Sequence, residues 1–327
     1  MAKRNVRWGR ILGALFLLAL IAGGVKLLTA ELPPAPPHAR VAPKLDALPP
    51  VQVCWLEFSR SDLWGQLGTA GLTRTPTWRN TASGLLVRHP KGTVLIDSGY
   101  SPNTLVEAEE RPLMARRFTK VAYTGARDFS TVTEALRRVG ATPEELTWFI
   151  PSHAHEDHLG GMVELTQTPV LLPAEEQAFI QATATHGAVM PAHARALEGR
   201  MTPMAFEPKP YETFDESFDV FGDGVLVVAK LPGHTPGSIV TFVNLSPTRR
   251  LAYVGDTVNL TESIERRLPK STLMQFYTDM DSEEAGRAVA RLTQLHELAP
   301  ELHMQPAHDR DAWEKFFGGA PGCVSAR

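Results

Sequence analysis

The stretch PSHAHEDHLGGM, residues 151–162, places three histidines and two acidic residues within six positions. Its order is His-x-His-x-Asp-His, with His153, His155, Asp157 and His158 at the fixed positions. Neutral imidazole and carboxylate groups are ligands that suit Zn²⁺. The alternative is a polar loop in which histidines cluster without function, but such an ordered pattern rarely arises by chance. We therefore interpret the stretch first as a metal-binding loop.

Three later segments each place a candidate ligand where an apolar run ends in a turn. A rigid scaffold presents loop residues for chemistry at such positions. The three are His234 in LPGHTPGS (231–238), Asp256 in LAYVGDTVNL (251–260) and His308 in MQPAHDRDAW (304–313). One Zn²⁺ takes three or four protein ligands, so seven candidates suit two metal ions better than one.

With these motifs in this order, the chain resembles the metallo-β-lactamase superfamily of metal-dependent hydrolases over roughly residues 51–317. The resemblance implies an α/β fold, a four-layered αββα sandwich with the metal site along one edge. The predicted order of strands and helices favours the same two packed sheets with helices outside. The resemblance also implies two Zn²⁺ per chain. His153, His155 and His234 would hold the first ion, Asp157, His158 and His308 the second, and Asp256 would bridge them.

This ligand set predicts hydrolysis of a small ester, lactone or amide by a metal-bridged hydroxide. Asp157 is also the expected proton relay to the leaving group. Asn259 is the expected hydrogen-bond donor to an oxyanion. Asp97 ends an apolar strand, and similar acids in this superfamily support the metal loop from behind, so we expect that role for it. Glu156 lies between two ligands and is expected to face solvent.

Other activities of the same fold remain alternatives. The exported β-lactamases usually lack the bridging acid that Asp256 supplies. The glutathione thioesterases add a C-terminal helical domain, for which the nineteen residues after His308 leave little room. The acyl-homoserine lactonases share the seven ligands and the His-Asp ending, but they often carry a tyrosine where this chain has Asn259. Phosphoester hydrolysis and a metal-binding scaffold without catalysis are the remaining alternatives.

Residues 1–30 predict export. Four basic residues and no acid precede ILGALFLLALIAGGV (residues 11–25), an uncharged and mostly apolar run. This pattern is typical of a secretory signal, and residues 11–30 are also long enough for a membrane anchor. Both interpretations keep the basic residues cytoplasmic. The rest would lie in the periplasm or on the extracytoplasmic face of the inner membrane, and whether the segment is cleaved stays open.

The composition beyond residue 30 separates a linker from a domain. Seven prolines in residues 31–50 predict an extended spacer, so the hydrolase domain is expected to occupy residues 51–327. Cys54 and Cys323 are the two cysteines of the chain. Export permits a disulfide between them, but their spacing alone does not show one, and Cys54 also suits a core position.

Charge and apolar segments bear on the partner. Residues 31–327 hold 28 basic and 36 acidic side chains, a formal net charge of −8. A nucleic-acid binder needs a basic surface, so we expect a small-molecule substrate and no nucleic acid. Two segments are candidate pocket walls. The Met-rich insert at residues 186–206, which contains His186 and His193, is either an ordinary pair of helices or a flexible lid, and we favour the former. STLMQFYTDM (271–280) is the second.

Overall fold

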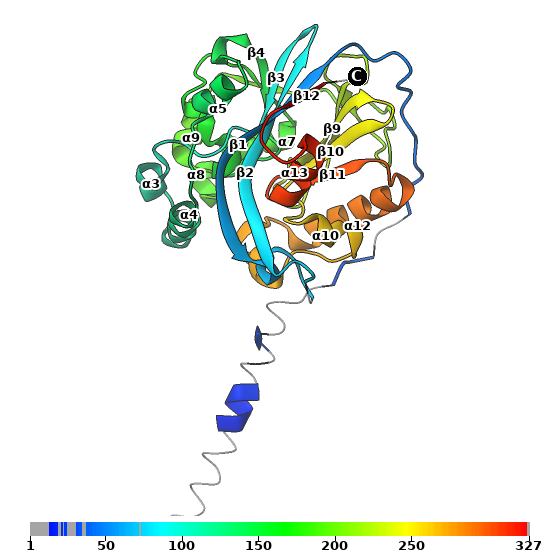
Figure 1. Ribbon diagram of the computed structural model, residues 1–327. Helices are drawn as coiled ribbons and strands as arrows, with labels where there is room; N and C mark the ends of the chain where they lie inside the picture. Colours follow the sequence, from blue (N-terminus) through cyan, green and yellow to red (C-terminus); the bar gives the residue numbers. More distant parts are fainter. Residues whose placement is uncertain are drawn as a thin grey trace, which may run out of the picture.

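Two β-sheets packed face to face form the centre of the computed structural model, which describes residues 13–18, 21, 23–24, 31–34, 37–71 and 73–325 (Figure 1). The first sheet has seven strands in the order β12-β1-β2-β3-β4-β5-β6. The second has five, in the order β11-β10-β9-β8-β7. Helices cover the outer faces of both sheets, so the predicted αββα sandwich is confirmed.

The elements follow the chain in the order of their numbers. The strands are β1 (Gln52–Trp64), β2 (Thr77–His89), β3 (Gly92–Ile96), β4 (Leu146–Ile150), β5 (Val170–Leu172), β6 (Met201–Pro203), β7 (Phe218–Asp219), β8 (Leu226–Lys230), β9 (Ile239–Ser246), β10 (Arg249–Gly255), β11 (His303–Pro306) and β12 (Cys323–Ser325). The α-helices are α2 (Gly65–Gly68), α3 (Thr104–Glu107), α4 (Leu113–Gly125), α5 (Val132–Arg138), α6 (Glu156–Leu159), α7 (Ala174–Gln181), α8 (Thr183–His186), α9 (Pro191–Leu197), α10 (Thr261–Glu265), α11 (Thr272–Thr278), α12 (Ser282–Leu298) and α13 (Arg310–Phe317).

Strand β1 shows how the sequence builds three apolar layers. Successive side chains of a strand point to opposite faces. Val53 and Trp55 therefore enter the core between the two sheets, whereas Cys54 and Leu56 enter the core between the first sheet and its helices. Helix α12 closes the third layer over the second sheet. Because both faces of the central strands are covered, their sequences are almost continuously apolar.

The segment LGGMVELT (159–166), after the histidine motif, has a 3₁₀ turn at Gly160–Val163. The two glycines explain the tight path. A Cβ on Gly160 would lie 2.2 Å from the backbone nitrogen of Ser101, and one on Gly161 would lie 2.4 Å from the carbonyl oxygen of Ser98. The turn thereby packs directly against the backbone that follows β3.

Helix α13 and strand β12 were not predicted from the sequence. β12 is a three-residue edge strand that pairs with the start of β1, where Cys323 lies directly opposite Cys54. The two cysteines form a disulfide with their Cα atoms 3.9 Å apart. Cys54 is also fully buried, so it occupies the core position that its neighbours suggested and takes part in the disulfide as well.

The described part of the Pro-rich segment lies against the domain. The backbone of Val41 pairs with that of Glu212, and Leu45 is buried. Arg40 forms ion pairs with Glu212 and Glu301 at 2.7 and 2.5 Å. Residues 37–50 of the predicted spacer therefore form a strap held on the domain surface. Most of the predicted signal or anchor lies outside the described residues, and among the described residues no helix is long and apolar enough to cross a membrane.

Candidate metal centre

Four loops at the carboxyl ends of strands carry the seven predicted ligands. His153 follows β4 by three residues, His234 follows β8, Asp256 follows β10 directly, and His308 follows β11. β10 and β11 run parallel, with Gly255 paired to Pro306, so the last two ligands leave neighbouring strands side by side. The loops after β4 and β8 meet through a backbone hydrogen bond from Ile239 to Ser152. The structure thus brings all seven side chains to one edge of the two sheets.

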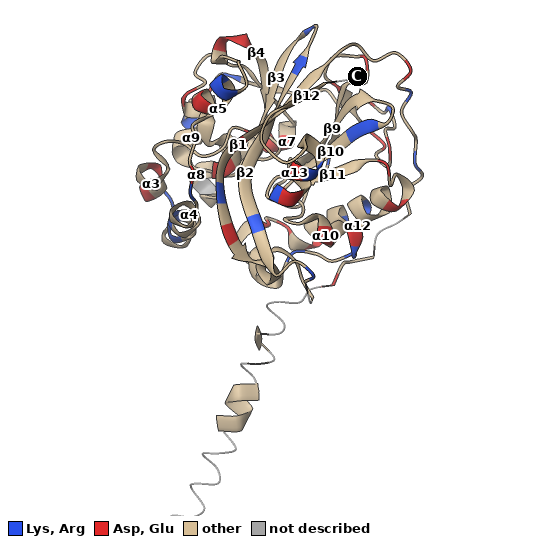
Figure 2. Cartoon of the chain, viewed as in Figure 1, with Lys and Arg blue, Asp and Glu red and all other residues tan. Residues whose placement is uncertain are grey.

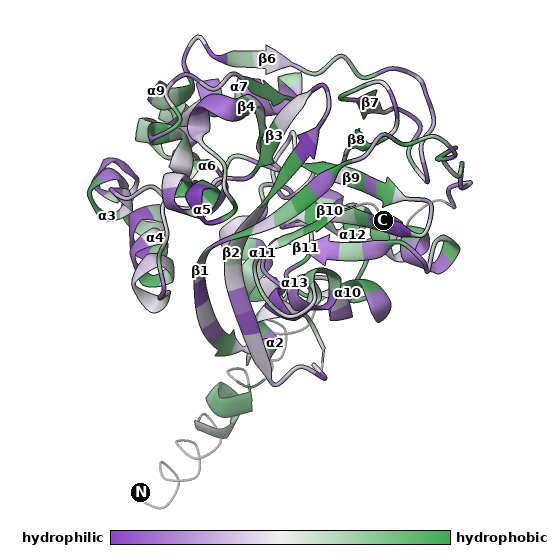
Figure 3. Ribbon diagram, turned by 45° about the horizontal axis from the view of Figure 1, so that its top comes forward, coloured by the Kyte–Doolittle hydropathy of each residue, from purple (hydrophilic) through white to green (hydrophobic). Residues whose placement is uncertain are grey.

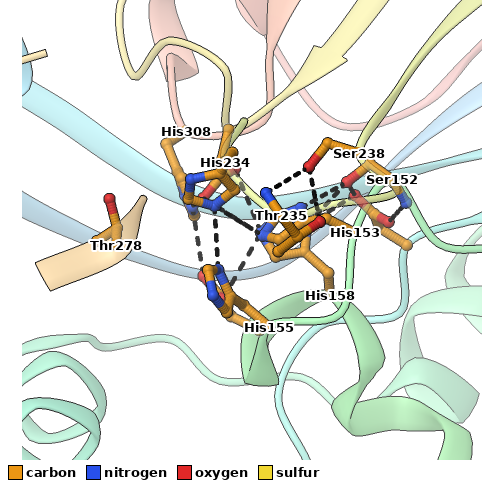
Figure 4. A network of polar contacts seen from close by, with 12 residues as sticks. Ser152, His153, His155, His158, His234, Thr235, Ser238, Thr278 and His308 are labelled. Carbon is orange, nitrogen blue, oxygen red and sulfur yellow. Dashed lines mark hydrogen bonds and ion pairs between the residues drawn. The ribbon is translucent and has the colours of Figure 1, made fainter. Parts of the chain in front are cut away.

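The first predicted ligand group consists of three imidazoles. Nε2 of His234 lies 3.1 Å from Nε2 of His153 and 3.0 Å from Nδ1 of His155 (Figure 4). Donor atoms of all three rings lie within 4.8 Å of one another. Nδ1 of His234 is hydrogen-bonded to the carboxylate of Asp279 at 2.7 Å. The lone pair on Nε2 therefore remains available to a metal ion. Bare nitrogens that converge in this way are stabilised by a shared cation.

The second predicted group adjoins the first through Asp256. Nε2 of His308 lies 3.3 Å from Oδ2 of Asp157 and 3.0 Å from Oδ2 of Asp256. The same Asp256 oxygen lies 3.7 Å from Nε2 of His234, in the first group. Nε2 of His158 and Oδ1 of Asp256 lie 3.3 Å apart, and both are buried without a hydrogen bond among the described residues. Buried ligand atoms that face each other without a hydrogen bond fit a metal pair that Asp256 would bridge.

Asp97 supports the histidine motif in the way that the sequence suggested. This fully buried carboxylate accepts from the backbone and hydroxyl of Ser152 at 2.6 and 2.8 Å, and from the Tyr253 hydroxyl at 2.6 Å. It also lies 2.7 Å from Nδ1 of His158. Asp97 adopts a left-handed backbone conformation, with φ of 59°. A carboxylate on the outer ring nitrogen fixes the tautomer and direction of a metal-binding histidine.

Two residues that sequence reasoning missed hold His234. The Asp279 carboxylate accepts a hydrogen bond from Nδ1 of His234 at 2.7 Å and another from Nζ of Lys270 at 2.6 Å. Lys270 is 2 % exposed, and its Nζ also lies 2.9 Å from Nδ1 of His234. No local motif marks this arrangement, because the partners of His234 come from a segment 36 and 45 residues further along the chain. Only the fold brings them together.

Burial and mutual proximity set the protonation of the ligands. Burial lowers the pKa of His153 and of His155 well below the ordinary value, and neighbouring imidazoles lower it further. Burial alone would raise the pKa of Asp256, but the His308 and His158 rings beside it hold the pKa well below its usual range. Burial opposes a charge on His158 and His308 as well, but Asp256 beside them raises the pKa of both rings. A metal ion that binds here would take the place of the protons on these two rings, because metal ligation requires neutral imidazole and ionised carboxylate.

Glu156 corrects the sequence prediction. It was expected to face solvent, but it is 7 % exposed and forms an ion pair with Arg111 at 2.9 Å. The Thr119 hydroxyl also donates to it at 2.7 Å. The cause is the start of α6, which turns the side chain between His155 and Asp157 away from the ligands and toward α4. Glu156 therefore attaches the metal loop to the neighbouring helix.

A pocket with a volume of about 290 Å³ opens over the ligands. His155, Asp157, Asp256 and His308 lie on its floor together with Asn259. Its walls are mainly apolar: Leu63, Leu67, Trp78, Phe118, Val121 and Met274 line it. Nδ2 of Asn259 is buried and has no hydrogen-bond partner among the described residues. Its amide therefore has a free donor beside the candidate metal ligands.

Of the two segments predicted as candidate pocket walls, one lines the pocket and the other packs elsewhere. Residues 271–280 contain α11 (Thr272–Thr278) and supply Met274, Tyr277 and Thr278 to the pocket. The Met-rich insert lies elsewhere: His193 is fully buried against Glu107, and His186 stacks on Phe179. The interpretation that we favoured, ordinary packed helices, agrees with these contacts. No described residue of the insert lines the pocket.

Comparisons with known proteins agree with this fold. The metallo-beta-lactamase superfamily pattern matches residues 76–314. An N-acyl homoserine lactonase of Bacillus thuringiensis is 23% identical over 256 residues, which are 75% of this chain and 86% of that protein. The N-acyl homoserine lactonase AttM of Azorhizobium caulinodans is 24% identical over 254 residues, or 72% and 84% of the two chains.

Solved structures show the same likeness. A variant of B. thuringiensis AiiA with N-decanoyl-L-homoserine bound at its active site has a TM-score of 0.59 and 18% identity, covering 81% of this chain and 95% of that one. The dizinc quorum-quenching lactonase AidC, in complex with the product N-hexanoyl-L-homoserine, has a TM-score of 0.52 and 17% identity, covering 83% and 90%. With its sequence matched from residue 76 to residue 314, this chain belongs to the metallo-beta-lactamase superfamily.

Proposed function

We propose that this chain hydrolyses lactones or esters that carry an apolar acyl chain, with two zinc ions held by the seven clustered side chains. The observation that carries the proposal is a pocket in which four of these ligands form the floor and apolar side chains form the walls. The similarity to N-acyl homoserine lactonases supports the same reaction class. A pocket of this kind favours an apolar group beside a reactive carbonyl.

Zinc, when bound, would supply Lewis acidity and lower the pKa of a water ligand to about 7. The protein side chains carry the rest of the reaction. Asp157 lines the pocket floor, where its carboxylate can take the proton of the attacking water and pass it to the oxygen of the leaving group. The free Nδ2 of Asn259 can donate a hydrogen bond to the carbonyl oxygen as negative charge develops on it.

Phosphoester hydrolysis, the rival reaction, would need a free cationic side chain in the pocket to bind the phosphate. Of the described residues that line it, Arg111 is the one with a basic side chain other than histidine. Its guanidinium is already engaged with Glu156, with the hydroxyl of Thr119 and with the carbonyl oxygen of Ala188. A phosphate dianion would therefore find no free Arg or Lys. A carboxylic ester or lactone needs none.

The decisive experiment is a hydrolysis screen of the zinc-loaded full chain together with a zinc determination. Decanoyl and butyryl homoserine lactones, aryl esters, β-lactams and phosphoesters are compared at equal concentration. We expect about two zinc ions per chain and the highest kcat/KM for the decanoyl lactone or for a long-chain ester. Asn259→Ala should lower kcat on that substrate by about 10²-fold. A leading rate on β-lactams or phosphoesters, or no hydrolysis by the zinc-loaded chain, would refute the proposal.

We also propose that the enzyme acts outside the cytoplasm. The basic and apolar start of the sequence supports export. The disulfide between Cys54 and Cys323 supports it independently, because structural disulfides persist in oxidising compartments. A reporter that is active only outside the cytoplasm, fused after Arg327, should be active. Activity of a cytoplasmic reporter at the same position would contradict export.

A further inference from the structure

The mouth of the pocket lies between two helices. Phe118 of α4 stacks on Tyr277 of α11, with ring centroids 5.3 Å apart and an interplanar angle of 9°. Val121, on the next turn of α4, lines the pocket and is nevertheless 72% exposed. Tyr277 also lines the pocket and is 39% exposed. Side chains that belong to the pocket and to the surface at once mark its opening, so substrate enters between α4 and α11.

Large apolar side chains surround this opening without belonging to the pocket. Phe276 is the neighbour of Tyr277 in α11 and is 76% exposed. Met114 lies one turn before Phe118 in α4 and is 58% exposed. Trp64, also 58% exposed, is the last residue of β1 and directly follows the pocket residue Leu63. Large exposed apolar side chains near a pocket mouth indicate a surface that another apolar phase covers.

The charge of α4 identifies that phase. Within Leu113–Gly125 the helix carries Arg116, Arg117 and Lys120 and no acidic residue (Figure 2). Arg116 and Lys120 both form ion pairs with Glu109. Arg117 is exposed and has no ion-pair partner among the described residues, and it lies at helical spacing between Met114 and Val121. An exposed stripe that places a free basic side chain between apolar ones suits the boundary between acyl chains and anionic headgroups.

The N-terminal region approaches the same side of the molecule. Leu32 packs on the core beneath α12, and Pro33 lies against Gly286, one turn after the start of that helix. Only Asp279–Asp281 separate α12 from α11. Figures 1 and 3 both draw the described residues 13–18 beyond the end of β1. Leu15, Phe16 and Leu17 in that segment are each more than half exposed.

We propose that a mouth face, defined by Trp64, Met114, Arg117 and Phe276, docks on the surface of an anionic lipid bilayer. The apolar side chains enter the headgroup boundary, and Arg117 contacts lipid phosphate. The pocket then opens against the bilayer. Resting on the proposed function, this placement lets a substrate with a long acyl chain pass from the lipid into the pocket without crossing water.

The test uses the full chain and vesicles that contain brominated phosphatidylcholine and phosphatidylglycerol. Bromine quenches tryptophan at the boundary, and the contribution of Trp64 is obtained as the difference between the wild type and Trp64→Phe. We expect the bromine to quench roughly half of the Trp64 emission. Met114→Asp/Phe276→Asp should abolish this quenching, and Arg117→Glu should reduce it. Val41→Asp, which changes an exposed apolar residue of the strap, is the matched control and should leave it unchanged.

Two results would overturn the proposal. In the first, the chain co-sediments with the vesicles but Trp64 is not quenched, so that the mouth faces water. In the second, Met114→Asp/Phe276→Asp converts a dimer into a monomer without any change in quenching, so that a second copy covers the face. Thermal unfolding and circular dichroism establish that each variant is folded. Because quenching does not depend on catalysis, it separates a failure of docking from a failure of the proposed hydrolase activity, which the soluble butyryl lactone measures.

Discussion

Asp97 and Asp279 each orient one of the histidine ligands. Each carboxylate contacts the outer ring nitrogen of one histidine at 2.7 Å, Asp97 at His158 and Asp279 at His234. A carboxylate in this position directs the inner nitrogen at the metal and raises its basicity. Only Asp97 could be predicted, because it directly follows a recognisable apolar strand. The candidate metal centre therefore includes these two carboxylates as well as the seven ligands.

At the residue scale, Asp157→Asn tests the proton relay. The change removes a charged ligand and the group that passes a proton to the leaving oxygen, so kcat should fall by about 10²-fold or more. Steady-state rates on the best substrate, with zinc content determined on the same sample, measure the effect. Asp311→Asn is the control, because Asp311 is an exposed acid on α13 that pairs with Arg79. A rate for Asp157→Asn equal to that of the parent would exclude the relay.

Asp279→Asn tests whether the buried pair positions His234. The change leaves Lys270 buried without a counter-charge and weakens the hold on the His234 ring, so zinc affinity should fall by 10–100-fold. Competition with a fluorescent chelator measures the affinity. Lys270→Met/Asp279→Asn removes both charges and should recover much of the lost stability but not the affinity. Recovery of both would mean that the pair has a structural role only.

At the scale of elements, the sequence predicts a helix or strand only where that segment carries its own apolar pattern. Strands such as β9 and β10 and the helix α12 carry their own periodicity, so a short window of sequence is enough to predict each of them. The 3₁₀ turn at Gly160–Val163 cannot be predicted in this way, since the backbone of Ser98 and Ser101 imposes it from another segment. β12 was also missed, because three residues become a strand only beside the edge of β1. The pocket walls likewise follow from the meeting of α4 with α11.

Helix α7 holds two of the metal loops through one carboxyl group. Glu176 is 1 % exposed and accepts from the Thr235 hydroxyl and, at 2.8 Å, from the backbone N–H of Gly237, in the turn that carries His234. Burial raises its pKa to about 7, and the hydrogen bonds from Thr235, Gly237 and the backbone of Ala154 oppose that rise only in part. A buried carboxyl with a raised pKa is held more firmly in its protonated form.

This predicts a pH-dependent stability. The folded pKa exceeds the unfolded one, so the stabilisation is fully present below about pH 4.5 and is lost as the pH rises through about 7, roughly 3 kcal/mol in all. Chemical unfolding of the metal-free chain between pH 5.5 and 8.5 measures it. Glu176→Gln stays neutral and should lack this slope, whereas Glu175→Gln, in an exposed pair with Lys230, should keep it. Equal slopes for wild type and Glu176→Gln would refute the assignment.

At the scale of the whole molecule, the disulfide joins the two ends of the domain. Cys54 and Cys323 are separated by 269 residues, and the bond fixes β12 on the edge of the seven-stranded sheet. The sequence left this pairing open, because two cysteines so far apart carry no sign of proximity. The fold decides it by returning the chain, after α13, to the start of β1. A bond that closes a loop of this length restricts the unfolded chain strongly.

The last prediction concerns this bond. Its loss should lower the free energy of unfolding by about 2–4 kcal/mol and the melting temperature by roughly 5–15 °C in a domain of this size. Cys323→Ala breaks the bond and keeps the buried Cys54, so it separates the crosslink from core packing. Differential scanning fluorimetry with and without a phosphine reductant measures the effect. The reductant should lower the melting temperature of the wild type to that of Cys323→Ala and leave the variant unchanged. A wild type that is indifferent to the reductant, while mass spectrometry shows both thiols free, would show that the edge strand holds without the bond. The domain would then be equally stable in a reducing compartment, and the disulfide would no longer support export.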